Sequence, residues 1–356
     1  MTVPLFATTL EDHHGRLAEA LTRVLESGRY ILGPEVDAFE LEFSRYLGAR
    51  HVVGVANGTD AITIALRALG VAPGDEVVVP SFTFYASVEA VVNAGAKPVF
   101  CDVDPDTFCV TEETVKRALT PRTRAVMAVH LFGNVAPDLG DVGLPVLEDA
   151  AQAAGAARDG TRAGALGDAA TFSFFPSKNL PCLGDGGAVV TSSDEVAERA
   201  RTLRFHGSKD KATFTEVGYN SRLDELQAAA LRVLLPELDG WVATRRATAR
   251  AYEREGLGEH VRLSRTVDGA EHAYHLYVVR SARANELAAA LADRHIGARA
   301  YYRVPVHRQP AMRGFPAPEL PGTDEAARTH LALPMGTGLG DEAVREVVAA
   351  CTSVGS

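Results

Sequence analysis

Short valine-rich runs alternate with stretches of helical periodicity, and this alternation constrains the fold more than any other feature of the sequence. Strands are expected in five such runs, at residues 51–56, 76–80, 97–102, 124–130 and 145–148. Helical stretches at 60–69 and 86–94 separate the first three runs. Strands that alternate with helices predict a mainly parallel sheet sandwiched by helices, which is an α/β fold.

Helices are expected on both sides of this pattern in the sequence. Within the first 50 residues, one amphipathic helix ends at Gly28 and a second begins at Pro34 and ends at Gly48. Later elements include strands at 169–174 and 187–191, a helix at 194–203, and a long helical pattern at 222–252 that is interrupted at Pro236.

The last part of the chain shows a different order of predicted strands and helices. A strand at 274–280 is followed by helices at 284–295 and 341–351, which is typical of a smaller α+β domain. We therefore expect a large domain over residues 1–240 and a small C-terminal domain over residues 241–356. The N-terminal helices could pack on the small domain.

Composition excludes several classes of protein. The net charge of −10 argues against a nucleic-acid or membrane partner, and no apolar run is long enough to span a bilayer. The four cysteines form no C-x-x-C pair and no signal segment opens the chain, so the cytoplasm is the expected location. No metal site is expected, because the His13-His14 pair lacks a cysteine or a spaced acidic partner.

Polar residues directly after the predicted strands are the candidate site residues, since ligands of open α/β sheets bind at the carboxyl ends of the strands. Asn57-Gly58-Thr59-Asp60 opens a helix whose free N–H groups favour a phosphate, although such a turn in isolation is usually only a cap. The aromatic run Phe82-Thr83-Phe84-Tyr85 could provide a platform for a flat ligand.

Two further strand ends carry acidic and basic groups. Glu148-Asp149-Ala150-Ala151-Gln152 ends one apolar strand with two carboxylates and an amide. Lys178 lies in an apolar, glycine-rich stretch, where burial would lower the pKa of its amine and make it nucleophilic; a surface lysine in a turn is the alternative.

The order and spacing of these motifs resemble the DegT/DnrJ/EryC1/StrS family of PLP-dependent nucleotide-sugar aminotransferases of fold type I. The matching segments are Arg29-Tyr30-Ile31-Leu32-Gly33-Pro34, Asn57-Gly58-Thr59-Asp60, Glu148-Asp149-Ala150-Ala151-Gln152, Phe172-Ser173-Phe174, Lys178-Asn179-Leu180, Gly184-Asp185-Gly186-Gly187, His206-Gly207, Gly218-Tyr219-Asn220-Ser221-Arg222-Leu223-Asp224 and Pro305-Val306-His307.

The resemblance implies that Lys178 forms a Schiff base with pyridoxal 5′-phosphate (PLP) and then moves the proton as a free amine. It implies that Asp149 keeps the pyridine nitrogen protonated, so that the ring can accept electrons. Gln152 would bind the phenolic oxygen of the ring, and Phe84 would stack on the ring.

The same resemblance implies a phosphate cradle that two subunits share. Gly58, Thr59 and Ser173 would hold the phosphate of the cofactor from one chain. Asn220 would reach the same phosphate from the second subunit. A homodimer with shared active sites is therefore expected.

Five residues are candidate substrate contacts. Tyr301 stands where many relatives have a histidine, His307 belongs to the Pro-x-His element, and Arg303 either meets an acidic group or is exposed without contact. His206 and Lys209 lie in a stretch that relatives use near the nucleotide sugar. Lys209 would neutralise the diphosphate or lie on a solvated loop.

The implied reaction moves an amino group from an amino acid, L-glutamate, to a keto carbon of a nucleotide-activated sugar, with the cofactor cycling through pyridoxamine phosphate (PMP). The segment Pro181-Cys182-Leu183 together with Asp185 looks more like relatives that act on 3-keto sugars. The alternatives are a 4-keto aminotransferase, a PLP- or PMP-dependent sugar dehydratase, which Lys178 disfavours, and a PLP-binding regulatory protein.

Overall fold

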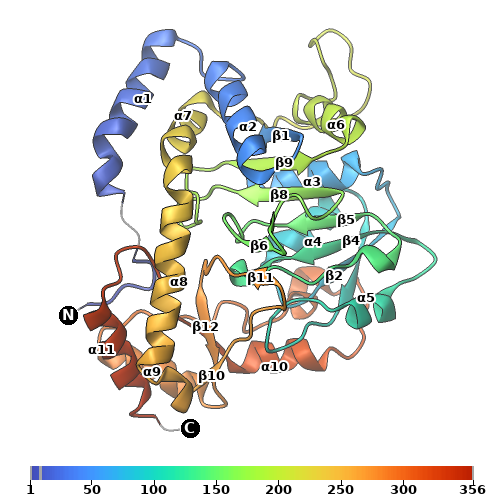
Figure 1. Cartoon of the computed structure of the whole chain (residues 1–356). Coiled ribbons are helices and arrows are strands. Elements are labelled where there is room, and N and C mark those ends of the chain that lie inside the picture. Colours follow the sequence, from blue (N-terminus) through green and yellow to red (C-terminus); the bar gives the residue numbers. More distant parts are fainter. Residues whose placement is uncertain (1, 8–9, 355–356) are drawn as a thin grey trace.

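The computed structural model describes residues 2–7 and 10–354, and a seven-stranded sheet lies at its centre (Figure 1). The spatial order of the strands is β1-β9-β8-β5-β4-β2-β3. Only β9 runs antiparallel to its neighbours, and the other neighbouring pairs are parallel. The strands are β1 (His51–Val55), β2 (Glu76–Pro80), β3 (Lys97–Cys101), β4 (Thr123–Val129), β5 (Val146–Asp149), β8 (Ala169–Ser173) and β9 (Gly187–Thr191). The predicted α/β fold with a mainly parallel sheet is confirmed.

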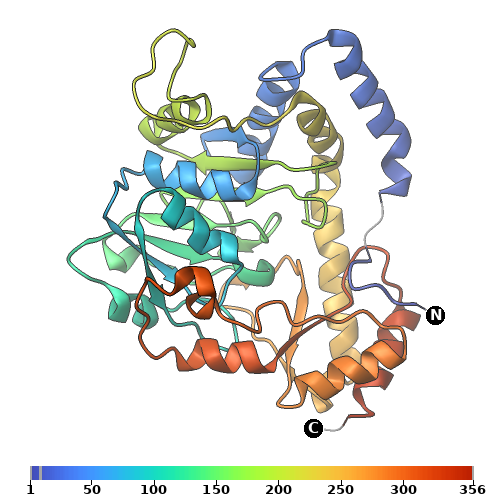
Figure 2. The ribbon, with the colours of Figure 1, turned by 180° about the vertical axis from the view of Figure 1, so that it is seen from behind.

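Helices cover both faces of this sheet. Figure 1 shows α2 in front of the sheet, and Figure 2, seen from behind, shows α3 and α4 over the other face. The helices of this part of the chain are α1 (His14–Ser27), α2 (Pro34–Leu47), α3 (Gly58–Ala68), α4 (Tyr85–Asn93), α5 (Glu112–Ala118), α6 (Asp194–Arg204) and α7 (Glu225–Leu234). Each face has its own apolar core: Val189 of β9 belongs to the core with α3, and the next residue, Val190, belongs to the core with α2. Alternate side chains of a strand point to opposite faces, so a single strand serves both cores.

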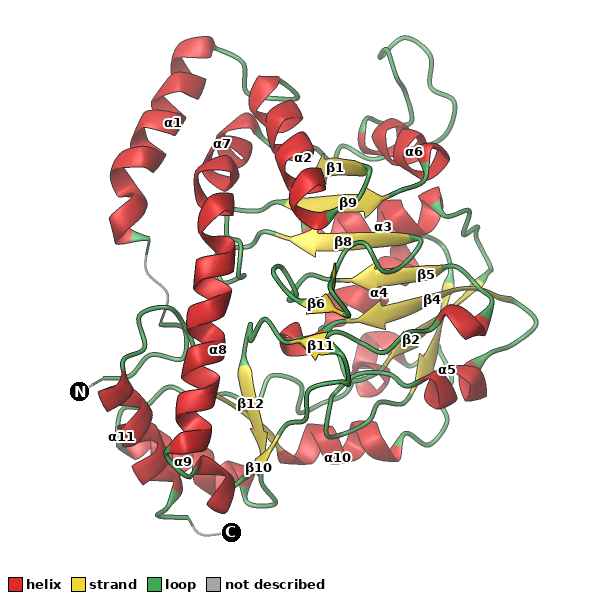
Figure 3. Ribbon diagram, viewed as in Figure 1, coloured by secondary structure: helices red, strands yellow, loops and turns green. Residues whose placement is uncertain are grey.

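The C-terminal part of the chain forms a second, smaller sheet with its own helices (Figure 3). Its strands are antiparallel and lie in the order β10-β12-β13. The elements are α8 (Leu238–Arg254), β10 (Arg262–Leu263), β12 (Tyr277–Arg280), α9 (Ala284–Asp293), α10 (Pro321–Thr329), β13 (His330–Leu333) and α11 (Asp341–Cys351). A small third sheet pairs β11 (Ala270–Glu271), β6 (Ala157–Arg158) and β7 (Thr161–Arg162). Short 3-10 helices lie at Glu11–His13, Leu131–Gly133, Gly140–Val142, Leu235–Glu237, Leu257–Glu259, Val306–Arg308 and Pro310–Met312.

The observed elements depart from the predicted ones where the backbone takes conformations that a periodicity does not reveal. β12 begins at Tyr277 rather than at residue 274, because Tyr274 has a φ of +46°, which no strand residue adopts. The interruption that the sequence predicts at Pro236 is confirmed, since a 3-10 turn at Leu235–Glu237 separates α7 from α8, but α7 begins at Glu225 rather than at residue 222. The sequence interpretation missed α5, α10 and β13.

The N-terminal region contacts both parts of the chain. α1 and α2 pack on α7, whereas the segment before them reaches the small domain through backbone bridges of Val3 to Ile296 and of Phe6 to Met335. The domain boundary at residue 240 stays a prediction. Among the described residues, no helix is both long enough and apolar enough to cross a membrane.

A buried carboxylate fixes the end of β5. Glu148 accepts hydrogen bonds from His130 Nε2 (2.8 Å) and from the backbone N–H groups of Gly164, Leu166 and Gly167 (2.7–2.8 Å). Burial alone would raise the pKa of this carboxyl group, yet these donors hold it below its usual value. Glu148 therefore ties β5 to two loops that are distant in the sequence.

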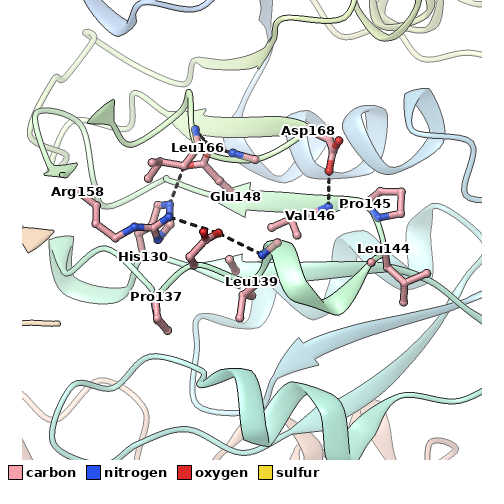
Figure 4. A pocket seen from close by; sticks show the side chains of 15 residues that line it. His130, Pro137, Leu139, Leu144, Pro145, Val146, Glu148, Arg158, Leu166 and Asp168 are labelled. Atoms are coloured by element: carbon pink, nitrogen blue, oxygen red, sulfur yellow. Dashed lines mark hydrogen bonds and ion pairs between the residues drawn. The ribbon is translucent and has the colours of Figure 1, made fainter. Parts of the chain in front are cut away.

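The Glu148 side chain borders a hollow of about 540 Å³, and Figure 4 shows His130, Arg158 and Asp168 around it. Asp168 accepts from the backbone N–H of Val146 at the start of β5 (2.8 Å). None of the site residues predicted from the sequence lines this hollow. We conclude that the contacts on the Glu148 side of β5 hold the strand in place and are not part of the candidate site.

Replacing Glu148 by glutamine should destabilise the fold. The amide keeps only one acceptor oxygen, so at least one buried donor loses its partner, and we expect the free energy of unfolding to fall by about 3 kcal/mol. Urea denaturation measures this loss, and the exposed Glu319→Gln should change stability by less than about 0.5 kcal/mol. Equal stability of the two variants would show that the Glu148 contacts are dispensable.

Candidate active site

Several of the predicted cofactor-binding residues lie where parallel strands end at one edge of the large sheet. Asp149 is the last residue of β5, Ser173 is the last residue of β8, and Gly58 begins the helix that follows β1. Since β1, β5 and β8 run in the same direction, their carboxyl ends meet at the same edge. The fold therefore brings together side chains that lie more than 100 positions apart in the sequence.

Asp149 is buried, and a serine from α4 orients its carboxylate. Ser87 Oγ donates to Asp149 Oδ2 (2.7 Å) and in turn accepts from Thr83 Oγ1 (2.9 Å). The backbone N–H of Ala151 donates to the other carboxylate oxygen (3.2 Å). Each oxygen still has a free lone pair, so the carboxylate can bind a cationic N–H group of a ligand.

Lys178 follows β8 in a tight loop, where its own N–H donates to Phe175 O (2.8 Å). Burial lowers the pKa of its amine from 10.5 to about 8, while the negative charge of Asp149 acts in the opposite direction. Loss of hydration disfavours the ammonium form, and the nearby carboxylate favours it. The Lys178 amine thus deprotonates far more readily than an exposed lysine, as a nucleophile or a base requires.

The start of α3 is built to approach an anion closely. Asn57 caps the helix by accepting from the Asp60 N–H (2.8 Å), and the N–H groups of Gly58 and Thr59 precede the first intrahelical bonds. A Cβ atom on Gly58 would lie 2.7 Å from Ser173 Cβ, so only glycine lets this serine close against the turn. Free N–H groups, the positive end of the helix dipole and a hydroxyl suit a phosphate.

Gln152 and Phe84 occupy the remaining predicted positions. The Oε1 atom of Gln152 accepts from the Phe132 N–H (2.7 Å), and its Nε2 atom donates to the Tyr302 hydroxyl (3.2 Å). Phe84 is 57% exposed at the start of α4, whereas Phe82 lies in the core. A buried acid, a basic amine and an anion cradle, together with an exposed ring at the start of α4, fit PLP, which is flat, phosphorylated and carries a ring nitrogen.

Three predicted residues lie on the segment that follows α6. Asn220 is exposed and forms a backbone bridge with Phe205, and His206 is exposed with a φ of +62°. Lys209 forms an exposed ion pair with Glu198. Within the described part of one chain, none of the three has a hydrogen bond or an ion pair to another predicted site residue, so their roles stay predictions.

The predicted substrate residues of the small domain lie on its connection between α9 and α10. Tyr301 is half-buried, with the Arg299 guanidinium 4.9 Å from its ring centre, and Arg303 donates to the backbone carbonyl of Arg328 (3.2 Å). His307 Nδ1 lies 2.6 Å from Ser81 Oγ, directly after β2. Burial and the nearby charge of Arg308 lower the pKa of His307. Only His307 is thereby joined to the edge of the large sheet.

Three residues close to the site escaped the sequence interpretation. Ser87 holds Asp149, Tyr302 holds Gln152, and His275 is a buried imidazole whose Nδ1 atom has no hydrogen-bond partner and whose pKa is lowered by burial and then by Lys178. A serine on the buried face of α4, four residues after Thr83, is the one signal that could have identified Ser87. Nothing in the sequence indicates that residues 275 and 302 approach β5.

Comparison with known proteins agrees with this geometry. A model of the DegT/DnrJ/EryC1/StrS aminotransferase family matches residues 11–352. The dTDP-3-amino-3,4,6-trideoxy-alpha-D-glucose transaminase of Streptomyces venezuelae is 46% identical over 92% of this chain and 89% of that protein. A pleiotropic regulatory protein of Geobacillus stearothermophilus is 44% identical over 98% of this chain and 97% of that protein. The crystal structure of S. venezuelae DesV in complex with a ketimine intermediate has a TM-score of 0.94 at 43% identity, over 99% of this chain and 98% of that chain.

The pKa of Lys178 predicts how the reaction of cofactor-free protein with PLP depends on pH. Only the unprotonated amine attacks the aldehyde, so the rate should rise with pH with its midpoint at about pH 8 and level off once the amine is fully deprotonated. In Asp149→Asn the midpoint should move to lower pH, because the opposing negative charge is lost. Stopped-flow absorbance measures the rate, and a midpoint near the 10.5 of an ordinary lysine would contradict the assignment.

Proposed function

The chain belongs to the DegT/DnrJ/EryC1/StrS aminotransferase family, and on that premise we propose that it uses PLP to transfer the amino group of L-glutamate to the C3 keto carbon of a nucleotide-activated sugar. One observation carries this proposal. The low-pKa amine of Lys178 lies within the field of the buried Asp149 carboxylate, at the sheet edge where α3 offers free N–H groups. A nucleophile, an acid and an anion cradle are the groups that PLP-dependent transamination needs.

Bound PLP supplies an electron sink for the pair of electrons that remains when the donor loses its α proton. Asp149, oriented by Ser87, holds the proton on the ring nitrogen. Lys178 Nζ would hold the cofactor covalently and, as a free amine, would move the α proton of the donor. Lys178 does so in both half-reactions, so one amine serves the glutamate and the sugar.

The other residues of the site hold the ring and its phosphate. The N–H groups of Gly58 and Thr59 and the hydroxyl of Ser173 bind the phosphate. The amide of Gln152 donates to the phenolic oxygen of the ring, and Phe84 covers one face of the ring. The proposed contacts to the nucleotide sugar are Tyr301, Arg303, His307, His206 and Lys209.

The preference for a 3-keto sugar is supported by the loop after the lysine. The N–H of Cys182 donates to Phe174 O (2.7 Å), and the N–H of Leu183 donates to Gln227 Oε1 (2.8 Å), so this loop is tied to β8 and to α7. Leu183, which is 44% exposed, is the residue of this loop that we propose to contact the sugar. The similarity to the S. venezuelae transaminase, whose name specifies a 3-amino sugar, points the same way.

Matched 3-keto and 4-keto nucleotide sugars, each supplied with glutamate, test the proposed reaction. We expect amination of the 3-keto sugar, with the new C–N bond located at C3 by NMR. Lys178→Ala should lower the rate by several orders of magnitude, since both proton transfers lose their base. Preferential amination at C4 would overturn the 3-keto assignment alone, and no amination of either sugar would overturn the proposed activity.

A homodimer with shared sites is the proposed assembly. Large apolar side chains are exposed on loops of the large domain: Tyr30 (46%), Ile31 (45%), Leu183 (44%), Phe214 (57%) and Val217 (83%). Exposed apolar groups at this density favour burial against another protein surface. A second copy of the chain is the partner that would also carry Asn220 to the phosphate cradle.

Mixed dimers of Lys178→Ala and Asn220→Ala chains test the shared site. Each homodimer is impaired in both of its sites, whereas a mixed dimer has one site with both defects and one intact site. We expect mixing to restore activity, measured after exchange of differently tagged chains. Absence of recovery despite proven exchange would place Asn220 in the site of its own subunit.

A regulatory role is the second candidate, because the G. stearothermophilus relative is named as a regulatory protein. A regulatory role would not require Lys178, whereas aminotransferase activity would. A Lys178→Ala variant that keeps its function would therefore favour the regulatory role. Lys178 also disfavours the dehydratase alternative, since that chemistry in the family replaces the lysine by histidine. The cytoplasmic location stays a prediction.

A further inference from the structure

Tyr302 belongs to the small-domain part of the chain but is buried against the large sheet. Its ring is stacked on Phe132, with ring centres 5.8 Å apart and planes inclined by 14°, and it meets the edge of Phe82 at 5.6 Å. Its hydroxyl oxygen accepts a hydrogen bond from Gln152 Nε2 (3.2 Å). A residue on the connection between α9 and α10 thus reaches one of the predicted cofactor-binding side chains.

Phe132 fixes the other end of the Gln152 amide. The Phe132 N–H donates to Gln152 Oε1 (2.7 Å), so the carbonyl of the amide points to Phe132 and the NH₂ group points to Tyr302. Phe132 holds a φ of +61°, a conformation that costs free energy in any residue other than glycine and that is found mainly at functional sites. Phe132 therefore orients the Gln152 amide through its backbone N–H and the Tyr302 side chain through its ring.

The backbone of Tyr302 is anchored separately in the small domain. Its N–H donates to His330 Nε2 (3.2 Å), and His330 Nδ1 lies 2.8 Å from Ala326 O in α10. Burial lowers the pKa of His330 to about 4, so the imidazole is neutral and can accept at Nε2 while it donates at Nδ1. The position of the Tyr302 ring is thereby set by the junction of α10 and β13.

We propose that Tyr302 is a positioning residue of the cofactor site, whose hydroxyl holds the Gln152 amide so that the second N–H of this amide donates to the phenolic oxygen of PLP. An amide nitrogen carries two N–H groups, and the bond to Tyr302 uses one of them. The inference rests on the proposed PLP-dependent function. It adds a contribution of the small domain to the binding of the cofactor ring.

Burial raises the pKa of Tyr302, and the charge of Asp149 raises it further, so the phenol stays neutral at any working pH. A neutral hydroxyl leaves Gln152 free to donate, whereas a phenolate would compete with the ring oxygen for the same N–H groups. The hydrogen bond from Gln152 stabilises the ionised phenolic oxygen of the cofactor and lowers the pH at which the lysine-bound cofactor loses its proton.

The test is a spectrophotometric pH titration of protein loaded with PLP. In Tyr302→Phe the Gln152 amide loses its partner, and we expect the midpoint of the visible band to rise by about half a pH unit and PLP to bind about threefold more weakly. Tyr252→Phe is the matched control, because it removes a buried tyrosine hydroxyl that donates to Pro334 O (2.9 Å) within the small-domain core. This control should leave the midpoint unchanged.

A double-mutant cycle establishes that Tyr302 acts through Gln152. In the Gln152→Ala background, Tyr302→Phe should cause no further rise of the midpoint. An equal rise in both backgrounds, or no rise in Tyr302→Phe alone, would overturn the inference while the wild-type protein still binds PLP. A wild-type protein with no visible band would instead overturn the proposed function itself.

Discussion

The alternation of side chains at the end of β5 is the constraint on which the site depends. Glu148 faces the supporting side of the strand, where His130 and three backbone N–H groups hold it, and the next residue, Asp149, faces the site. Successive residues of a strand point to opposite faces, so fixing one carboxylate fixes the direction of the other. A shift of β5 by one residue would turn Asp149 to the opposite face of the sheet and remove its carboxylate from the site.

The residues that orient Asp149 and lower the pKa of Lys178 lie on different rigid elements. Ser87 of α4 orients the carboxylate, and the loop after β8 buries Lys178 so that its pKa falls. Ser87, Asp149 and Lys178 are each held by a different strand of the large sheet or by a helix packed on it. Their relative positions therefore follow from the packing of these elements. Such preorganisation avoids the free energy that the chain would otherwise spend on arranging these groups in every turnover.

Charged contacts hold the small domain against the large one. Asp106, in the turn after β3, forms ion pairs with Arg262 of β10 and Arg280 of β12, and Asp104 pairs with Arg265 (2.8 Å). On the connection between α9 and α10, Tyr302 contacts Gln152 and His307 contacts Ser81. The small domain therefore reaches the edge of the large sheet where the candidate site lies.

The sequence by itself determined the sheet, most helix limits and the candidate site residues that end or follow a strand, such as Asp149 and Lys178, because hydrophobic periodicity and strand-end position are local properties. It could not give the start of β12, since hydrophobic periodicity does not reveal the left-handed conformation of Tyr274. It also could not give the contacts of Ser87, His275 and Tyr302, whose proximity to β5 arises only when separate elements pack together. Tertiary structure alone decided that the Gln152 amide is held between Phe132 and Tyr302, because a hydrogen bond between residues 150 positions apart has no local signature.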